Sequence, residues 1–356
     1  MSLRARLEAL IAAEGPLTAA QWMEHCLHDP LEGYYAVRPA LGAEGDFITA
    51  PLVSQMFGEL LGLWCAATWE AMGRPKRVRW VELGPGDGAL VTDARRALTR
   101  AAPDFLAAAE LVLIDRSAPL RQRQRIALAG APVRWAERLD AVEGGAPLIL
   151  LANELLDCLP VRQFVRTERG WAERRVGLDG EGGFAWGLAP APGGFTPPAA
   201  LADAPPGALV EISPAQEALG AEIGARVMRD GGAALLIDYG REEPGPGDTL
   251  QALHRHRKVD PLADPGGADL TVHADFPAVA AAARAAGART ARLTQAELLR
   301  RLGVQARADA LARARPDRAD VLARQLHRLT APDQMGELFK ALVISSPGLA
   351  VPAFQP

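Results

Sequence analysis

The sequence predicts an α/β fold built around a mostly parallel sheet. Short apolar runs rich in β-branched residues recur along the chain, amphipathic helical segments separate them, and a glycine-rich turn directly follows the first run. Strands that alternate with helices favour a parallel sheet covered by helices on both faces. The expected strands are residues 78–83, 110–115, 133–135, 146–152, 233–239 and 338–345.

The N-terminal part of the chain is predicted to be helical. An apolar stripe within residues 1–14 indicates a packed helix, and the acidic residues there are unlike a targeting peptide. A short helix over 18–27 is expected next, then a loop over 29–35, and a long amphipathic helix that begins at Val53. We therefore expect residues 1–75 to form a helical extension and lid.

The remaining segments are expected to be insertions on the sheet and helices that cover it. Alternating residues in 161–165 and 172–178 predict antiparallel strands, and 191–207 is a Pro-, Gly- and Ala-rich loop. Further helices are expected over 214–229, 277–286, 294–301 and 306–329, and an extra loop over 101–109. The expected organisation is a core of 76–160 and 208–289, an antiparallel insertion 161–207, a helical insertion 290–335, and a closing strand and tail 336–356.

Composition excludes several classes of partner. The 356 residues carry a formal net charge of −4 with both signs mixed throughout, so nothing favours nucleic acid or an anionic membrane. No run of 18 apolar residues occurs, and no membrane insertion is expected. The three cysteines are widely spaced and lack a C-x-x-C pair, which is typical of a reduced, intracellular chain.

Two acids bracket the three glycines that follow the first strand. Glu82 and Asp87 flank Gly84 and Gly86, and Gly88 leads into a helix over 89–100. A strand, a glycine turn and a helix allow a nucleotide-like ligand to approach bare backbone at the helix N-terminus. S-adenosyl-L-methionine carries an ammonium and a sulfonium, which suit an acidic loop, whereas a pyrophosphate would be repelled. The acids therefore favour the methyl donor.

The glycines by themselves leave two alternatives open. Gly84, Gly86 and Ala89 also fit the loose G-x-G-x-x-A pattern of dinucleotide-binding proteins, so an NAD-dependent oxidoreductase remains a rival. A turn that merely joins strand and helix is the structural alternative.

A second acid, Asp115, ends the apolar run 110–115. The ends of neighbouring parallel strands lie at one edge of a sheet, so its carboxylate can accept hydrogen bonds from both ribose hydroxyls of a nucleoside. The alternative is a strand that ends in a solvated Asp.

A third site is expected where the strand 146–152 delivers Asn153 and Glu154 to its C-terminal end. A carboxylate beside an amide can hold a nitrogen nucleophile, and an acid matches the donor fork of a guanidinium. These two residues are the candidate catalytic pair. The bland alternative is that they cap the following helix.

The segment before the long helix supplies the last candidates. Asp46 and Thr49 lie in a glycine-flanked loop, and Ser54 and Gln55 lie on the first helical turn, where they could reach the methionine end of the cofactor. A solvated helix start is the alternative.

Two other patterns are discounted. His25 and His28 have helical metal spacing, but no third ligand cluster accompanies them, so no metal is expected. The basic run 254–258 is expected to be a solvated loop, with docking of a protein partner as the sharper possibility.

Taken together, these motifs resemble the bacterial and mitochondrial MidA-like methyltransferases over nearly the whole chain. The matching stretches are Gly33–Tyr35, Gly45–Thr49, Ser54–Glu59, Glu82–Gly88, Asn153–Glu154, Leu159–Val161, Asp238–Gly240, Ala268–Thr271 and Asp275–Phe276. One departure is Leu52, where the family usually has a Glu that would complete a capping box with Thr49. We expect a weaker helix start there, and loss of a functional acid is the alternative.

The resemblance implies a Rossmann-like class I fold with a seven-stranded sheet and S-adenosyl-L-methionine as cofactor, with Pro85 part of its binding turn. It implies protein arginine N-methylation, with an exposed arginine of a respiratory complex I subunit, or its bacterial counterpart, as substrate, in the bacterial cytoplasm. A non-catalytic assembly factor that binds the same cofactor remains an alternative, and a homodimer remains possible.

Overall fold

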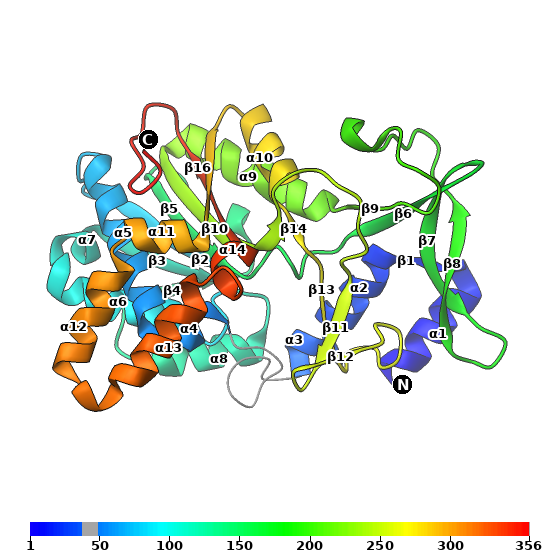
Figure 1. The fold of residues 1–356 in the computed structure, drawn as a ribbon, viewed down its shortest axis with the longest axis horizontal. Coiled ribbons are helices and arrows are strands. Elements are labelled where there is room, and N and C mark those ends of the chain that lie inside the picture. The colour runs from blue at the N-terminus through cyan, green and yellow to red at the C-terminus, as the bar shows by residue number, and fades with distance from the viewer. Residues whose placement is uncertain (38–48, 356) are drawn as a thin grey trace. The chain divides into compact units, whose positions relative to one another are not determined.

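The structure, a computed structural model, describes residues 1–37 and 49–355 (Figure 1). By its contacts the chain divides into two compact units. The first comprises Met1–Phe47, Leu156–Ala218 and Arg241–Ala278, and the second Ile48–Leu155, Leu219–Gly240 and Val279–Pro356. Much of the expected core range 208–289 therefore groups with the first unit, and helices α9 (Pro214–Asp230) and α10 (Phe276–Ala285) contain residues of both.

The second unit is built on the predicted sheet. Along its main path the sheet has the strand order β4-β3-β2-β5-β10-β16-β15, in which only β16 runs antiparallel to its two neighbours. Their bounds are β2 Val78–Leu83, β3 Ala109–Ile114, β4 Val133–Ala136, β5 Leu148–Asn153, β10 Gly232–Arg241, β15 Arg289–Thr294 and β16 Phe339–Ser345. The central strands are buried along almost their whole length, as parallel strands covered on both faces must be. The predicted α/β class and mostly parallel sheet are confirmed.

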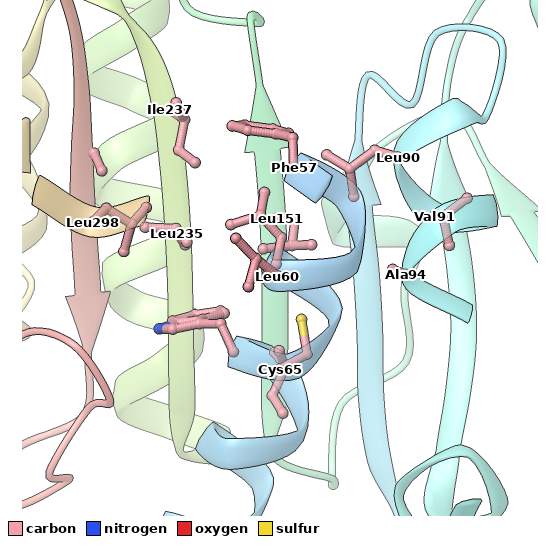
Figure 2. Close-up of a cluster of buried hydrophobic side chains, with 14 of the residues drawn as sticks. Phe57, Leu60, Cys65, Leu90, Val91, Ala94, Leu151, Leu235, Ile237 and Leu298 are labelled. Atoms are coloured by element: carbon pink, nitrogen blue, oxygen red, sulfur yellow. The ribbon is translucent and has the colours of Figure 1, made fainter. Parts of the chain in front are cut away.

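Helix α5 (Gln55–Ala71) packs its apolar side onto this sheet and against α6 (Ala89–Ala101) (Figure 2). Glycines allow the two helices to approach closely, because a Cβ added to Gly58 would lie 2.7 Å from the Leu90 carbonyl oxygen. One added to Gly62 would lie 2.9 Å from Ala94. The G-x-x-x-G spacing in α5 therefore fixes how α6, the helix after the glycine turn, is seated.

Several of the predicted elements differ in the structure. The expected long helix over 306–329 is two helices, α12 (Val304–Ala314) and α13 (Ala319–Thr330), because Pro316 cannot continue a helix. The expected loop over 101–109 contains α7 (Pro103–Ala108), with its proline in the first turn where no N–H is needed. Strand β15 lies inside the segment expected to be a helical insertion, followed by α11 (Gln295–Arg301) and, later, α14 (Met335–Leu338).

The first unit combines N-terminal helices with two small antiparallel sheets. The helices are α1 (Leu3–Glu14), α2 (Ala19–His28) and α3 (Tyr34–Val37), and the larger sheet has the order β1-β7-β6-β9 with β8 beside β7. Its bounds are β1 Leu17–Thr18, β6 Arg162–Thr167, β7 Gly170–Leu178, β8 Phe184–Pro190 and β9 Leu209–Ile212. The predicted antiparallel pairing of β6 and β7 is confirmed, and β8 adds a strand that was not expected.

The basic run 254–258 is not a plain loop. It forms the turn of a hairpin between β11 (Gln251–His254) and β12 (Arg257–Val259), with Arg255 and His256 at φ +50° and +60°. Strand β13 (Asp269–Thr271) pairs with β11 to complete a three-stranded sheet, and β14 (Ala274–Asp275) follows.

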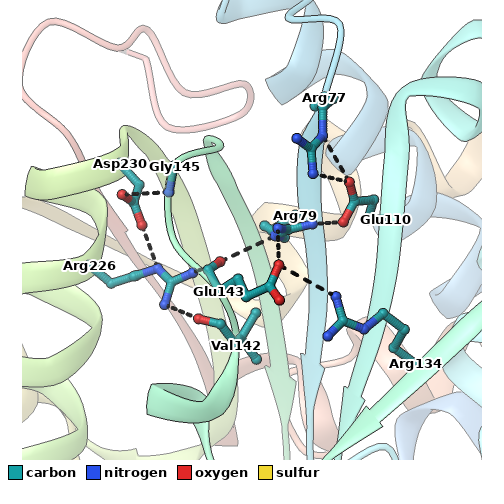
Figure 3. A network of polar contacts seen from close by, with 9 residues as sticks. All are labelled: Arg77, Arg79, Glu110, Arg134, Val142, Glu143, Gly145, Arg226 and Asp230. Carbon is teal, nitrogen blue, oxygen red and sulfur yellow. Dashed lines mark hydrogen bonds and ion pairs between the residues drawn. The ribbon is translucent and has the colours of Figure 1, made fainter.

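A network of charges joins the amino-terminal ends of β2 and β3 to the segment before β5 and to α9 (Figure 3). Arg79 of β2 is buried and pairs with Glu110 of β3 and Glu143, while Arg77 donates to Glu110 at 2.7 Å. Arg226 of α9 donates to the Glu143 carbonyl at 2.6 Å. These bonds stabilise the edge of the sheet opposite to the one where β2 ends. Among the helices of residues 1–37 and 49–355, none is both long and apolar enough to span a bilayer.

Candidate active site

The strand register brings the predicted site residues to one edge of the sheet. Leu83, the last residue of β2, pairs with Ile114 of β3 and with Ala152 of β5. The glycine turn, Asp115 and Asn153 follow these positions directly, so they lie side by side at the carboxyl ends of three adjacent strands. In open α/β sheets this edge is where ligands bind.

The turn after β2 requires its glycines. Gly84, Gly86 and Gly88 have φ of +63°, +55° and +89°, in the left-handed region that other residues rarely adopt. A Cβ on Gly84 would lie 2.9 Å from Leu155 Cδ1. The Gly88 N–H donates to the Pro85 carbonyl at 2.8 Å, which closes the turn just before α6 begins. The turn thus presents bare backbone at a helix N-terminus.

Burial changes the expected electrostatics of this turn. Glu82 is 2% exposed, and burial, followed by the charge of Asp87, raises its pKa to about 8. Its Oε2 has no hydrogen-bond partner among the described residues. Asp87 accepts from the Ala89 N–H at 3.0 Å. Contrary to the expectation of two anionic groups, Glu82 therefore keeps its proton near neutral pH until a cation, such as an amino acid ammonium, lies beside it.

Asp115 is held by hydrogen bonds to both of its oxygens. Its Oδ1 accepts from the Ser117 N–H at 2.8 Å, and its Oδ2 accepts from Gln124 Nε2 at 2.7 Å. Burial raises the pKa of Asp115, whereas these hydrogen bonds oppose the shift. A carboxylate has about four acceptor positions, so the two donors still leave one on each oxygen for the hydroxyls of a ribose.

Sequence reasoning missed Gln124, which lies on α8 (Ala118–Ala127) and is fully buried. It follows Leu120 by four residues, so helical spacing places this amide on the buried stripe of α8. A polar residue on the buried face of a helix is the sequence pattern that could have identified Gln124 as a candidate.

Asn153 and Glu154 form a connected pair at the end of β5. Glu154 Oε1 accepts from Asn153 Nδ2 at 2.9 Å and from the Ala50 N–H at 3.0 Å. Glu154 has φ +53°, a strained value for a side chain of this kind, and its own N–H donates to the Ile237 carbonyl at 2.8 Å. The Asn153 Oδ1 atom is buried and has no partner among the described residues.

The helix-capping alternative for this pair is wrong. After β5 the next regular element is strand β6, so no helix follows for Asn153 and Glu154 to cap. Strained backbone that the surrounding structure maintains is typical of functional sites.

The structure describes three of the four candidate residues in the segment that leads into α5. Asp46 lies outside the described residues. Thr49 precedes α4 (Ala50–Val53) and makes no side-chain cap bond. Ser54 is buried and accepts from the Met56 N–H at 3.3 Å, so α5 begins at Gln55 rather than at Val53. Gln55 donates to Glu59 at 3.2 Å. The structure thus gives Ser54 and Gln55 roles in helix α5.

Fold and site together define a Rossmann-like, class I S-adenosyl-L-methionine-dependent methyltransferase. A family described as "Putative S-adenosyl-L-methionine-dependent methyltransferase" matches residues 60–294, and the chain belongs to it. Its cofactor is therefore the methyl donor, which decides against the dinucleotide alternative.

Curated relatives and a solved structure are similar to this protein over more than nine-tenths of its chain. The protein arginine methyltransferase NDUFAF7 homolog, mitochondrial, of Drosophila melanogaster is 34% identical, covering 96% of this chain and 84% of that protein. The human protein arginine methyltransferase NDUFAF7, mitochondrial, is 32% identical, covering 92% and 80%. A Burkholderia thailandensis crystal structure with bound S-adenosyl-homocysteine has a TM-score of 0.84 and 30% identity, covering 99% of this chain and 92% of that one.

Proposed function

We propose that this methyltransferase transfers a methyl group to an arginine side chain of a protein substrate. The observation that carries the proposal is the Asn153–Glu154 pair, in which a carboxylate is oriented at the carboxyl edge of the sheet beside the glycine turn. The names of the mitochondrial relatives, which call them protein arginine methyltransferases, support the same substrate class.

The cofactor fits residues at the ends of β2 and β3. S-adenosyl-L-methionine supplies an activated methyl group on a positively charged sulfur. We propose that the backbone of Gly84–Gly88 and the carboxyl of Glu82 hold the methionine portion, because Glu82 Oε2 is buried and lacks a partner among the described residues. Asp115 holds the ribose through its two remaining acceptor positions. Thr49, the residue before α4, is proposed to contact the same portion of the cofactor.

In this proposal Glu154 orients the nucleophile. An acid pairs with the fixed donor fork of a guanidinium, and the Asn153 Oδ1 atom offers a further acceptor. The hydrogen bonds from Asn153 and Ala50 fix the direction of the Glu154 carboxylate before a substrate arrives. Because the donor is already activated, alignment of the attacking nitrogen is expected to supply most of the rate gain.

The test is transfer of radiolabelled methyl from S-adenosyl-L-methionine to candidate proteins, with a complex I subunit or its bacterial counterpart as first choice. Mass spectrometry then locates the modified residue. Label on arginine supports the proposal, and label on another residue type contradicts it. Tight cofactor binding without label on any complex I subunit would favour a non-catalytic assembly factor instead.

We propose the bacterial cytoplasm as the place of action. The three cysteines, Cys26, Cys65 and Cys158, are buried and form no disulfide among the described residues, as expected in a reducing compartment. A homodimer stays a prediction, which sedimentation of the purified chain would check.

A further inference from the structure

We infer that Gln124 is a positioning residue for cofactor binding. Its hydrogen bonds hold the Asp115 carboxylate and the glycine turn in fixed positions relative to each other. The inference rests on the proposed role of Asp115 in holding the ribose. It assigns a function to a residue of α8, which belongs to neither of the two ligand-facing segments.

The geometry uses both ends of the Gln124 amide. Its Nε2 donates to Asp115 Oδ2 at 2.7 Å and to the Gly86 carbonyl at 2.7 Å. Its Oε1 accepts from Trp135 Nε1 at 3.0 Å. One side chain therefore connects the turn after β2, the end of β3 and strand β4, and the Trp135 bond fixes which end of the amide faces the site.

The hydrogen bonds to Asp115 determine the orientation of its side chain, which the sheet register does not fix. Pairing of β2 with β3 aligns the backbones of the two segments, but it does not fix the rotation of the Asp115 side chain. The Ser117 N–H on Oδ1 and the Gln124 amide on Oδ2 together orient the carboxylate plane. One acceptor position on each oxygen then remains for a pair of adjacent hydroxyls.

Because Gln124 is buried, loss of its hydrogen bond to Asp115 would not be compensated by water. Gln124 is 0% exposed, so water cannot readily replace its amide if the side chain is removed. Asp115 would then lose a donor in a partly desolvated place, and the Gly86 carbonyl would lose its partner. The same packing holds α8 close to the turn, since a Cβ on Gly88 would lie 3.6 Å from Gln124 Cα.

The experiment compares Gln124→Leu and Gln124→Glu with a matched control. Gln295→Leu is the control, because Gln295 is also fully buried and donates to a backbone carbonyl, that of Leu329, at 2.9 Å. Isothermal titration gives the Kd for S-adenosylhomocysteine, and steady-state kinetics give KM and kcat. We expect Gln124→Leu to raise Kd and the cofactor KM about tenfold with little change in kcat. Gln124→Glu should raise them further, because it places a second carboxylate beside Asp115.

A ligand that lacks the 3′-hydroxyl separates positioning from mere stability. In the unmodified protein the 3′-deoxy analogue of S-adenosylhomocysteine should bind about tenfold more weakly than the parent compound. This ratio should fall towards one in both Asp115→Ala and Gln124→Leu, and it should persist in Gln295→Leu.

If Gln124→Leu weakens both ligands equally while Asp115→Ala abolishes the ratio, Gln124 is only structural and the inference is overturned. If Asp115→Ala itself keeps the full ratio, the proposed ribose contact is wrong, and the inference that depends on it is overturned as well. The two failures are therefore distinguishable.

Discussion

Glu154 accepts a hydrogen bond from the backbone N–H of Ala50, the first residue of helix α4, at 3.0 Å. This helix begins without a side-chain cap from Thr49, and the sequence lacks the acid at position 52 that would complete a capping box. The acid at the end of β5 thus satisfies an N–H at the helix start that is otherwise left without an intrahelical partner. A backbone N–H therefore acts together with the Asn153 side chain to fix the proposed catalytic carboxylate.

The first prediction concerns this carboxylate. Glu154→Gln keeps an acceptor oxygen for the Ala50 N–H but removes the negative charge, so we expect kcat to fall about 100-fold or more, in the range of one lost charge-assisted interaction. The Kd for S-adenosylhomocysteine should stay near that of the unmodified protein. Methyl-transfer kinetics and calorimetry measure the two quantities. The control is Glu297→Gln, because the Glu297 side chain is partly exposed and forms an ion pair with Arg301. This variant should change neither kcat nor the Kd. Equal losses in kcat and cofactor affinity would move Glu154 from substrate orientation to cofactor binding.

The second prediction uses the raised pKa of Glu82, about 8 against an ordinary 4.5. Between these values the folded protein keeps a proton that the unfolded chain releases, so the free energy of unfolding should fall as pH rises through this window. Denaturant unfolding of the ligand-free protein at several pH values measures it. Glu82→Gln, which cannot ionise, should show a flatter profile, and an equally steep profile in that variant would assign the effect to another group.

A third prediction follows if the ammonium of the cofactor lies beside Glu82. The positive charge lowers the pKa of Glu82, so binding of S-adenosylhomocysteine at about pH 6.5 should release up to about one proton. Calorimetry in buffers of different ionisation enthalpy counts this proton. The release should disappear in Glu82→Gln, and buffer-independent heats in the unmodified protein would place the ammonium elsewhere.

The fourth prediction tests the glycine turn. Gly84→Ala forces a side chain into a left-handed conformation, at a cost of about 1–2 kcal/mol, and also brings its Cβ to 2.9 Å from Leu155 Cδ1. We expect lower stability and weaker cofactor binding. Gly130→Ala is the matched control, because Gly130 has φ +81° with nothing within 4 Å of an added Cβ. It should lose similar stability and keep its cofactor affinity, and a Gly84→Ala variant that binds normally would contradict the assignment of this turn.

The fifth prediction concerns the contact between α5 and α6. In Gly58→Ala the new Cβ would lie 2.7 Å from a backbone oxygen and 2.8 Å from Asp93 Cβ, neither of which can yield easily. Overpacking of this kind costs about 1–3 kcal/mol, against roughly 1 kcal/mol gained in helix propensity. Denaturant unfolding should show a net loss. Leu63→Ala, on the more exposed side of α5, should cost less, and a stabilised Gly58→Ala would show that the helices can separate freely.

Much of the fold could be predicted because the relevant signals are local. The runs that became β2, β3, β5 and β10 are apolar over their whole length, and Asp115 and Glu154 stand where such runs stop. Two elements that were predicted wrongly also have local causes, and both causes are prolines. Pro316 divides a helix, and Pro103 begins one.

The succession of strands and helices along the chain, the glycine turn and the acids that end two strands follow from local sequence, because hydrophobic periodicity and glycine conformation are properties of a short stretch of chain. Three features arise from the folded chain alone: the raised pKa of buried Glu82, the bonds by which Gln124 connects three segments, and the hydrogen bond from Ala50 to Glu154. Those facts depend on desolvation and on hydrogen-bond partners brought from distant positions, about which a single sequence carries no local signal.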